Sequence, residues 1–362
     1  MNDRLPDIES LPRHASPPIS AVIRRIPEDF WVDEIPVTEP NGEGEHLWVF
    51  VEKRSENTAE LANRLARAAG IRKSAVSYAG RKDRHALTRQ WFSLHMPGLP
   101  DPSIEQLAQA GLNVLRHARH TRKLRIGALR GNRFSLCLRE VEGERSTLDQ
   151  CLQAIAEHGV PNYFGEQRFG RAGGNLAGAL AMFEGRTRPD RERRSLYLSA
   201  ARSALFNAIL AERVRTDCWN CLLPGEAVQL DGSGSFFVTD AVDGDLPQRL
   251  DAWDIHPSGA LWGAGEPPSH DRAGALEREV ASRFPDLAAG LRAAGMKQER
   301  RPLRVRPADL TWRWEDAAQS DLILEFTLPA GVFATAVLRE IADYTDAAAS
   351  APTQRQEAAE QH

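Results

Sequence analysis

The sequence feature that limits the possible folds of this chain most strongly is a strand pattern that is interrupted and later resumes. Near residue 134 the apolar side chains of Phe134, Leu136 and Leu138 alternate with polar neighbours, as in a half-buried strand. From Val160 onward alanine-rich helical patterns prevail, at 175–183 and 199–216, before alternation reappears at 322–328. We therefore expect a strand-bearing unit and a second, helix-rich unit.

The strand-bearing part lacks the regular strand–helix–strand repeat of a parallel sheet. Strands are predicted at 19–36, 46–53, 75–79 and 87–94. A helix is predicted between Asn57, which resembles an N-cap with Glu60 three residues on, and Gly70, and another at 146–158. This mixture predicts an α+β fold with a largely antiparallel sheet.

Length and composition indicate a cytoplasmic protein without a membrane segment. The chain has 362 residues, of which 42% are hydrophobic, enough for about two domains. No apolar run approaches the length of a bilayer span, and residues 1–20 are polar and contain prolines, unlike an export signal.

Four cysteines are too few for a disulfide framework in a chain of this size, so we expect reduced thiols. Cys218 and Cys221 have zinc-knuckle or redox spacing, but a four-ligand zinc site needs a second pair, which the sequence lacks. Incidental packing is the preferred interpretation, and no metal site is predicted.

One carboxylate stands among cations. Asp83 is preceded by Gly80, Arg81 and Lys82 and followed by Arg84. Such neighbours keep a carboxylate ionised at neutral pH and leave cations to receive a larger polyanion. Asp83 also falls on the predicted connection between two strands, where catalytic residues concentrate. The combination indicates chemistry on a nucleic acid.

The charge distribution supports a nucleic-acid partner more than the net charge does. The net charge is −4, but no acidic residue occurs between Glu105 and Glu140. That interval contains the cations Arg116, Arg119, Arg122, Lys123, Arg125, Arg130, Arg133 and Arg139. A block of this kind is typical of phosphate binding, although a solvated basic face is the common alternative. We assign RNA-backbone contacts to Arg122, Lys123 and Arg125.

Several ordered motifs resemble one known family, tRNA pseudouridine synthase D (TruD). The resemblance runs nearly from end to end. It is carried by residues 27–30, 42–46, 79–86, 122–127, 131–134, 160–170, 328–331, 333–335 and 338–340. Ordered motifs at family-like spacing are much more specific than any single motif.

The resemblance implies an isomerase that converts uridine to pseudouridine at position 13 of tRNA, without a cofactor. It implies a pseudouridine-synthase-like mixed, mainly antiparallel sheet with helices, interrupted by an inserted α/β TRUD domain. We place the discontinuous catalytic domain at 1–158 plus 306–346 and the inserted domain at 159–305. Residues 347–362 are predicted to be a disordered tail.

The family's catalytic aspartate corresponds to Asp83, in a Gly-x-Lys-Asp pattern. An aspartate could attack ribose C1′, add to uracil C6, or remove a ribose proton to give a glycal, and the sequence does not choose among these routes. Lys82, Arg84 and Arg24 are the candidates to hold Asp83 ionised and to bind phosphate. Ordinary surface cations are the alternative for each.

The resemblance also assigns the contacts to a flipped-out uracil. Phe30 and Phe134 correspond to family aromatics near the base, and Asn132 corresponds to a polar contact. A flipped pyrimidine needs a stacking face and edge hydrogen bonds. Judged without the family, either Phe is more often core, and Asn132 could be a turn residue. The motif at 162–170 is interpreted as structural.

Two other classes of function compete with the enzyme. A non-catalytic RNA-binding protein or tRNA-folding chaperone would need the basic surface and the aromatics, but no central anion. A phosphohydrolase or metal-dependent nuclease would need several carboxylates converging on Mg²⁺, and no such cluster borders the basic motifs. The partner expected is tRNA, with no obligate protein partner.

Overall fold

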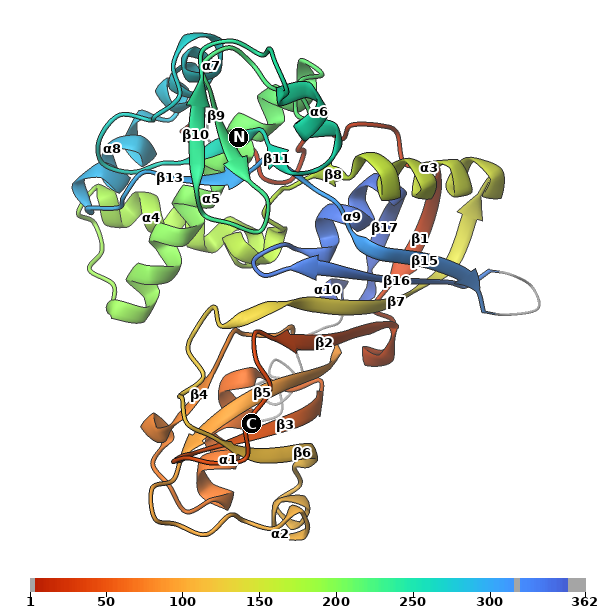
Figure 1. Ribbon diagram of the computed structural model, residues 1–362, viewed down its shortest axis with the longest axis vertical. Helices are drawn as coiled ribbons and strands as arrows, with labels where there is room; N and C mark the ends of the chain where they lie inside the picture. The colour runs from red at the N-terminus through yellow and green to blue at the C-terminus, as the bar shows by residue number, and fades with distance from the viewer. Residues whose placement is uncertain (1–3, 316–319, 351–362) are drawn as a thin grey trace, which may run out of the picture. The chain divides into compact units, whose positions relative to one another are not determined.

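The computed structural model describes residues 4–315 and 320–350 and divides into two compact units (Figure 1). The helical unit comprises Met1–Ser16, Gln153–Arg306 and Val332–Glu340. The sheet unit comprises Pro17–Leu152, Pro307–Gly331 and Ile341–His362. All of the predicted catalytic and RNA-contacting residues belong to the sheet unit.

The sheet unit is organised by one ten-stranded sheet. Its main strand order is β15-β16-β7-β2-β5-β3-β6, with β1, β17 and β4 attached to its sides. The strands are β1 (Ile19–Ile23), β2 (Phe30–Pro36), β3 (His46–Arg54), β4 (Val76–Tyr78), β5 (Leu87–His95), β6 (Asn113–His120), β7 (Leu129–Gly143), β15 (Ala308–Trp314), β16 (Leu322–Pro329) and β17 (Ala342–Asp346). Among the described strands of this sheet, only β1–β17 and β2–β5 pair in parallel. The prediction of a mainly antiparallel α+β sheet is confirmed.

The long strand β7 ties this sheet together. It pairs antiparallel with β16, β2 and β1 along successive parts of its length. The alternation noticed in the sequence explains this position, because Phe134 and Leu136 are buried on one face while Arg133 is exposed. The returning strand pattern near residue 322 is β16, the direct neighbour of β7.

Helices cover part of the sheet. In the sheet unit they are α1 (Thr58–Ala68), α2 (Ile104–Gln109), α10 (Ala347–Ser350) and the 3-10 turns η1 (Pro27–Asp29) and η2 (Lys73–Ala75). The apolar face of α1 packs Leu61 and Leu65 against Val49, Val51 and Phe92 of the sheet. Gly70, at φ +65°, follows the helix end, in line with the predicted stop.

The helical unit is built around one long helix. Its helices are α4 (Gly174–Phe183), α5 (Arg191–Arg215), α6 (Leu246–Asp251), α7 (Asp271–Arg283) and α8 (Pro285–Ala293), with the turns η3 (Glu166–Phe169) and η4 (Arg171–Gly173). Its strands are β8 (Val160–Pro161), β9 (Glu226–Leu230), β10 (Phe236–Thr239), β11 (Ile255–His256), β12 (Ser258–Leu261), β13 (Glu299–Pro302) and β14 (Arg304–Val305). Helix α5 supplies much of the core, including Leu205, Phe206 and Leu210.

Two helices contain boundaries between the units: α3 (Arg145–His158) and α9 (Ala334–Ile341). The predicted domain limits at 158/159 and 305/306 stay predictions. The predicted tail starts with the short helix α10, where the Ala348 amide donates to Asp346 Oδ1 (3.1 Å), and its remaining residues, 351–362, lie outside the described residues. Among the described helices, none combines the length and apolar character that a bilayer span requires.

Candidate active site

Asp83 lies on the connection between two antiparallel strands, as expected. Strands β4 and β5 pair with Tyr78 opposite Phe92, and the connection between them spans residues 79–86. Asp83 is half-buried, whereas the neighbouring Arg84 and His85 are exposed. The loop therefore holds the carboxylate at a partly covered position on a rigid sheet.

A buried lysine binds the backbone of this loop. Lys53, at the end of β3 and 3% exposed, donates from Nζ to the carbonyl oxygens of Asp83 and Glu56, each at 2.8 Å. Burial lowers the pKa of Lys53 to about 8, although the charges of Asp83 and Glu56 oppose this shift. Lys53 thus fixes the main chain of Asp83 and adds a positive charge beside it.

Two further polar side chains fix the start of the loop. Thr58 Oγ1 accepts from the backbone N–H of Lys82 at 3.1 Å and donates to Gln90 Oε1 at 3.1 Å. Gln90 Nε2 donates to the carbonyl of Gly80 at 3.2 Å. Because Thr58 and Gln90 are both buried, these bonds form away from competing water and restrict the loop to one conformation.

Lys82 has a carboxylate partner other than Asp83. Its Nζ lies 2.8 Å from Glu34 Oε2, and both side chains are buried, 6% and 1% exposed. Glu34 also accepts from the backbone N–H of Trp91 (3.2 Å). The sequence could not reveal this pair, because Glu34 lies 48 residues before Lys82 and reaches it only through the pairing of β2 with β5.

Arg24 is also paired, and it reaches the aromatic residues of the site. Its guanidinium forms a two-pronged pair with Asp346, with Nε to Oδ1 at 3.0 Å, and lies 5.5 Å from the centre of the Phe30 ring. Burial lowers the pKa of Arg24, but the bond to Asp346 and the charges of Asp346 and Asp83 outweigh it and raise the pKa above its usual value. Arg24 therefore interacts electrostatically with Asp83 and also contacts the ring of Phe30.

The predicted uracil contacts share one face of the sheet. The rings of Phe30 and Phe134 are in edge contact, with centroids 6.3 Å apart. In the β2–β7 register Glu34 lies opposite Asn132, and alternation places Asn132 and Phe134 on the same face. The Asn132 Oδ1 is buried and has no hydrogen-bond partner in the described part of the chain. A buried acceptor without a partner costs free energy unless a ligand supplies a donor.

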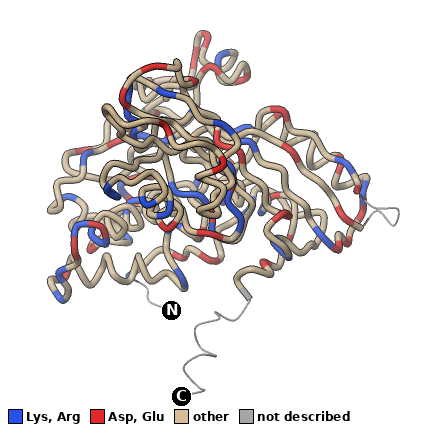
Figure 2. Tube along the Cα trace, turned by 90° about the horizontal axis from the view of Figure 1, so that it is seen from below, with Lys and Arg blue, Asp and Glu red and all other residues tan. Residues whose placement is uncertain are grey.

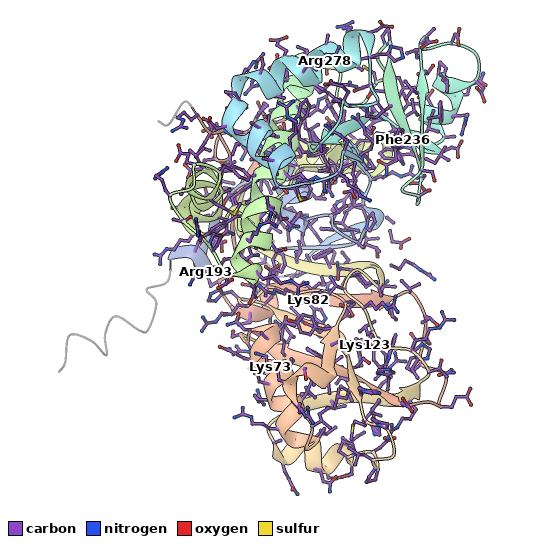
Figure 3. The ribbon with its side chains drawn as sticks, turned by 90° about the vertical axis from the view of Figure 1, so that its left-hand side faces the viewer. Lys73, Lys82, Lys123, Arg193, Phe236 and Arg278 are labelled. Carbon is purple, nitrogen blue, oxygen red and sulfur yellow. The ribbon has the colours of Figure 1, made fainter. Side chains whose placement is uncertain are left out.

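The three predicted RNA-backbone cations are exposed and adjoin the Asp83 loop. Arg122, Lys123 and Arg125 point outward around the buried Leu124, which packs with Ala79 and two tryptophans. The N–H of Gly127 donates to the carbonyl of Ala79 at 2.7 Å, so this segment is anchored where the Asp83 loop begins. Figure 3 labels Lys82 and Lys123 on these two segments.

Other cations of the basic block have structural roles. Arg116 pairs with Glu39 (3.2 Å), and Arg119 pairs with Asp101 (2.5 Å). Arg139 binds the buried Asp29 (2.7 Å). Along the described part of the trace, blue lysines and arginines are interspersed with red acids in many places (Figure 2). Arg119 and Arg139 are therefore half-buried in ion pairs, whereas Arg116 and its partner Glu39 are both exposed. The exposed cations of the block are the ones that RNA can contact.

Metal ligands do not gather in this unit or elsewhere in residues 4–315 and 320–350, where no three His, Cys, Asp or Glu side chains could hold an ion together. Within the described residues the four cysteines form no disulfide. The site consists of one carboxylate loop, two paired cations, two phenylalanines and an amide.

Comparisons with known proteins identify the family. A model of the family described as tRNA pseudouridine synthase D (TruD) matches residues 13–179 and 187–341. The chain belongs to the TruD family. It is 51% identical over 354 residues to the tRNA pseudouridine synthase D of Xanthomonas euvesicatoria pv. vesicatoria, covering 93% of this chain and 95% of that protein. The corresponding protein of Methylococcus capsulatus is 47% identical, with 94% and 96% covered.

The fold is likewise that of the TruD family. The crystal structure of the putative tRNA pseudouridine synthase D from Methanosarcina mazei superposes with a TM-score of 0.66 and covers 91% of this chain and 95% of that one. Sequence identity in this pair is 22%, so the similarity is one of fold. The predicted family and fold class are confirmed.

Within this TruD-family site, sequence reasoning missed the residues that act on the predicted ones. Lys53, Thr58 and Gln90 hold the loop, while Glu34 and Asp346 neutralise its cations. The only available signal was weak: a charged residue inside an apolar strand pattern, as at Lys53, indicates a buried partner.

Proposed function

We propose that this chain isomerises uridine to pseudouridine at position 13 of tRNA, with Asp83 as the catalytic carboxylate. Family membership supports the reaction class. The half-buried Asp83 on a loop whose backbone is held by Lys53, Thr58 and Gln90 is the observation that carries the residue assignment. Fixed geometry matters because a catalytic group misplaced by about 1 Å can lose roughly a hundredfold in rate.

The reaction itself explains why one carboxylate can suffice. The bond from ribose C1′ to uracil N1 breaks, the base turns, and a bond from C1′ to C5 forms while the C5 proton is lost and N1 gains one. No atom or electron is added overall, so no cofactor is needed. Asp83 could attack C1′, add to C6 or take a ribose proton, and each route requires an ionised carboxylate beside the nucleoside.

The face of β2 and β7 beside this loop suits a flipped uracil. Phe30 and Phe134, 3% and 6% exposed, form an apolar base for this face. Asn132 Oδ1, which has no hydrogen-bond partner in the described residues, supplies an acceptor for the N3–H of the base. The exposed Arg84 provides positive charge for a flanking phosphate, whereas Arg24 and Lys82, paired with Asp346 and Glu34, hold the geometry around Asp83. The exposed Arg122, Lys123 and Arg125 extend this field along the RNA backbone.

The remaining proposals concern the domain limits, the cellular location and the partners of the enzyme. Residues 1–158 plus 306–346 are proposed to form the catalytic domain, and 159–305 the inserted TRUD domain. The enzyme is proposed to act in the cytoplasm on tRNA without an obligate protein partner or a cofactor.

The decisive experiment replaces Asp83 with Asn and measures pseudouridine at tRNA position 13 under single-turnover conditions. We expect the rate to fall by about 10²–10⁴-fold or more, while tRNA binding is retained. Asp33→Asn is the matched control, because Asp33 lies on the face of β2 opposite to Phe30. This variant should react at the wild-type rate. Wild-type activity in Asp83→Asn would refute the assignment, and tRNA binding by the wild type without pseudouridine formation would favour the RNA-binding or chaperone alternative.

A further inference from the structure

Two arginines of the helical unit share one aromatic ring. Arg301 on β13 lies 4.1 Å from the centre of the Phe164 ring, and Arg168 on η3 lies 5.4 Å from it. Arg168 also lies 5.5 Å from the ring of Phe333. These guanidiniums come from segments more than 130 residues apart in sequence, so the fold brings like charges together.

Neither arginine has an anionic partner among residues 4–315 and 320–350. Arg168 donates to the hydroxyl of Ser199 (2.9 Å), and Arg301 donates to the amide oxygen of Asn162 (2.6 Å). Both partners are neutral. The Nε of each arginine is buried and has no hydrogen-bond partner within the described residues. The two cations thus keep unused donors and uncompensated charge.

Two buried arginines in the same unit are paired with acids. Arg213 binds Glu226 at 2.9 Å, and Arg300 binds Glu277 at 3.0 Å, with both acids buried. Arg300 is the chain neighbour of Arg301, so the difference between them does not arise from a general lack of acids in this region. Within the described chain Arg304 also lacks a paired acid, but its Nε and both terminal nitrogens donate to neutral acceptors. Arg168 and Arg301 combine the lack of an acid with an Nε that has no acceptor in the described residues.

The electrostatic cost appears in both side chains. Burial and the nearby Arg168 lower the pKa of Arg301 to about 9, and burial lowers the pKa of Arg168. Both remain cationic at neutral pH. A protein that holds two cations in this way gains when an anion arrives, since the ligand removes repulsion and satisfies the free donors.

The surroundings of the pair are rigid. Asn207, fully buried on α5, accepts from the backbone N–H of Phe164 and donates to its carbonyl, both at 2.9 Å. A Cβ on Gly165 would come within 2.6 Å of Thr335 Oγ1, so only glycine fits against that neighbour. Thr335 Oγ1 is itself buried without a partner in the described chain. The guanidiniums therefore stand on a preorganised base.

We propose that Arg168 and Arg301 together bind one phosphodiester group of the tRNA. This assignment rests on the proposed function and extends it to the segment 162–170, whose sequence motif was interpreted as structural. Guanidiniums match phosphate oxygens with paired N–H donors, which a lysine cannot do. Both residues are of intermediate exposure, so part of each remains at the surface.

The first test uses inorganic phosphate as the probe and the melting temperature of the full chain as the readout. Phosphate should raise the melting temperature of the wild type relative to chloride at equal ionic strength, because a ligand that binds only the folded state stabilises it. The double variant R168Q/R301Q should lose this increment. An equal increment in wild type and variant, or none in the wild type, would overturn the anion site.

The second test measures tRNA affinity across a salt series. We expect R168Q/R301Q to raise Kd about tenfold or more and to reduce the magnitude of the slope of log K against log salt by roughly one, as for the loss of one phosphate contact. Arg278→Gln, which removes an exposed arginine of α7 labelled in Figure 3, is the matched control and should leave both unchanged. The conservative variant R168K/R301K should restore part of the slope but less of the affinity.

The outcomes separate this site from the catalytic assignment. If phosphate stabilises the wild type but the double variant binds tRNA normally, the site takes a free anion only and the tRNA assignment is wrong. A merely structural role would lower the variant's melting temperature without phosphate and leave Kd unchanged, which also refutes it. Failure of the catalytic assignment would appear in Asp83→Asn, a protein in which both arginines are intact.

Discussion

The loop that carries Asp83 and the segment that carries Arg168 both contain glycine and arginine, yet they balance charge in opposite ways. Around Asp83 the cations have acids: Lys82 pairs with Glu34, and Arg24 pairs with Asp346. Around Arg168 the described residues supply none, and its neighbour Arg301 is also without one.

This difference separates two uses of positive charge. Paired cations hold a geometry and leave a single carboxylate to act, whereas unpaired cations at a partly exposed position await charge from outside the chain. A count of lysines and arginines cannot distinguish these cases. The two cases are distinguished by the side chains that each cation contacts.

The largest expected contrast is in stability. Lys82→Met should lower the free energy of unfolding by about 3–5 kcal/mol, because it leaves Glu34 buried without its cation. Arg168→Met should cost nothing or stabilise, since it removes repulsion. Urea unfolding at pH 7 without RNA measures both. Lys82→Met/Glu34→Leu is the control and should recover most of the loss; similar losses in Lys82→Met and Arg168→Met would remove the distinction between the two segments.

The second prediction concerns pH and Lys53. Its pKa in the folded state is about 8 against an ordinary 10.5, so between these values the unfolded chain holds a proton that the folded chain has released. The stability contributed by Lys53 therefore rises from pH 8 to pH 10.5 and is lost as the pH falls back through 8. The size is about 3 kcal/mol.

Unfolding of wild type and Lys53→Met at pH 7, 9 and 10.5 tests this. The difference in unfolding free energy should grow in favour of the wild type as the pH rises. Titrations of tyrosines and other lysines cancel in the comparison of the two proteins. A difference independent of pH would mean that Lys53 is not desolvated beside Asp83.

Much of the fold could be predicted from local pattern. The helix after Asn57 is α1, the predicted strand at 87–94 is β5, and the returning alternation at 322–328 is β16. These predictions are correct because strand and helix periodicity can be recognised within a short run of consecutive residues. Helix α5 begins at Arg191 instead of the predicted 199, because Asp190 caps its first turn by accepting from Arg193 N–H (2.8 Å), and the polar first turns hide the helical pattern.

The site was less readable than the fold. The cations around Asp83 indicated chemistry on a nucleic acid, but its catalytic role and the base contacts of Phe30 and Asn132 came from the motifs of a known family, since a lone aspartate among cations has no unique meaning. The partners that fix the site come from distant strands: Glu34 reaches Lys82 through β2, and Lys53 reaches Asp83 through β3. Such pairings depend on strand register, which single-sequence patterns do not specify.

A third prediction tests the exposed cations beside the Asp83 loop. Reversing Arg122, Lys123 and Arg125 to Glu should raise the Kd for tRNA about thirtyfold, ~2 kcal/mol, and flatten its salt dependence. Folding should be unaffected because all three side chains are exposed. Lys73→Glu, an exposed site on η2 labelled in Figure 3, is the control for loss of charge alone. Unchanged affinity across a salt series would assign these cations to a solvated face.

The smallest expected effect comes from two residues of β7, one of which should affect only the reaction rate and the other only the stability. Asn132→Leu should leave the free energy of unfolding unchanged or higher, since the Oδ1 of Asn132 has no partner to lose among the described residues. The single-turnover rate should fall about tenfold, ~1.4 kcal/mol, through loss of the acceptor for the base. Ser135→Ala, on the other face of β7, should lower the free energy of unfolding and leave the rate unchanged. The Ser135 hydroxyl donates to Glu325 Oε1 at 3.2 Å and lies on the face opposite to Phe134. If Asn132→Leu instead lowers stability at full rate, Asn132 is a structural residue of the strand and the base contacts another acceptor.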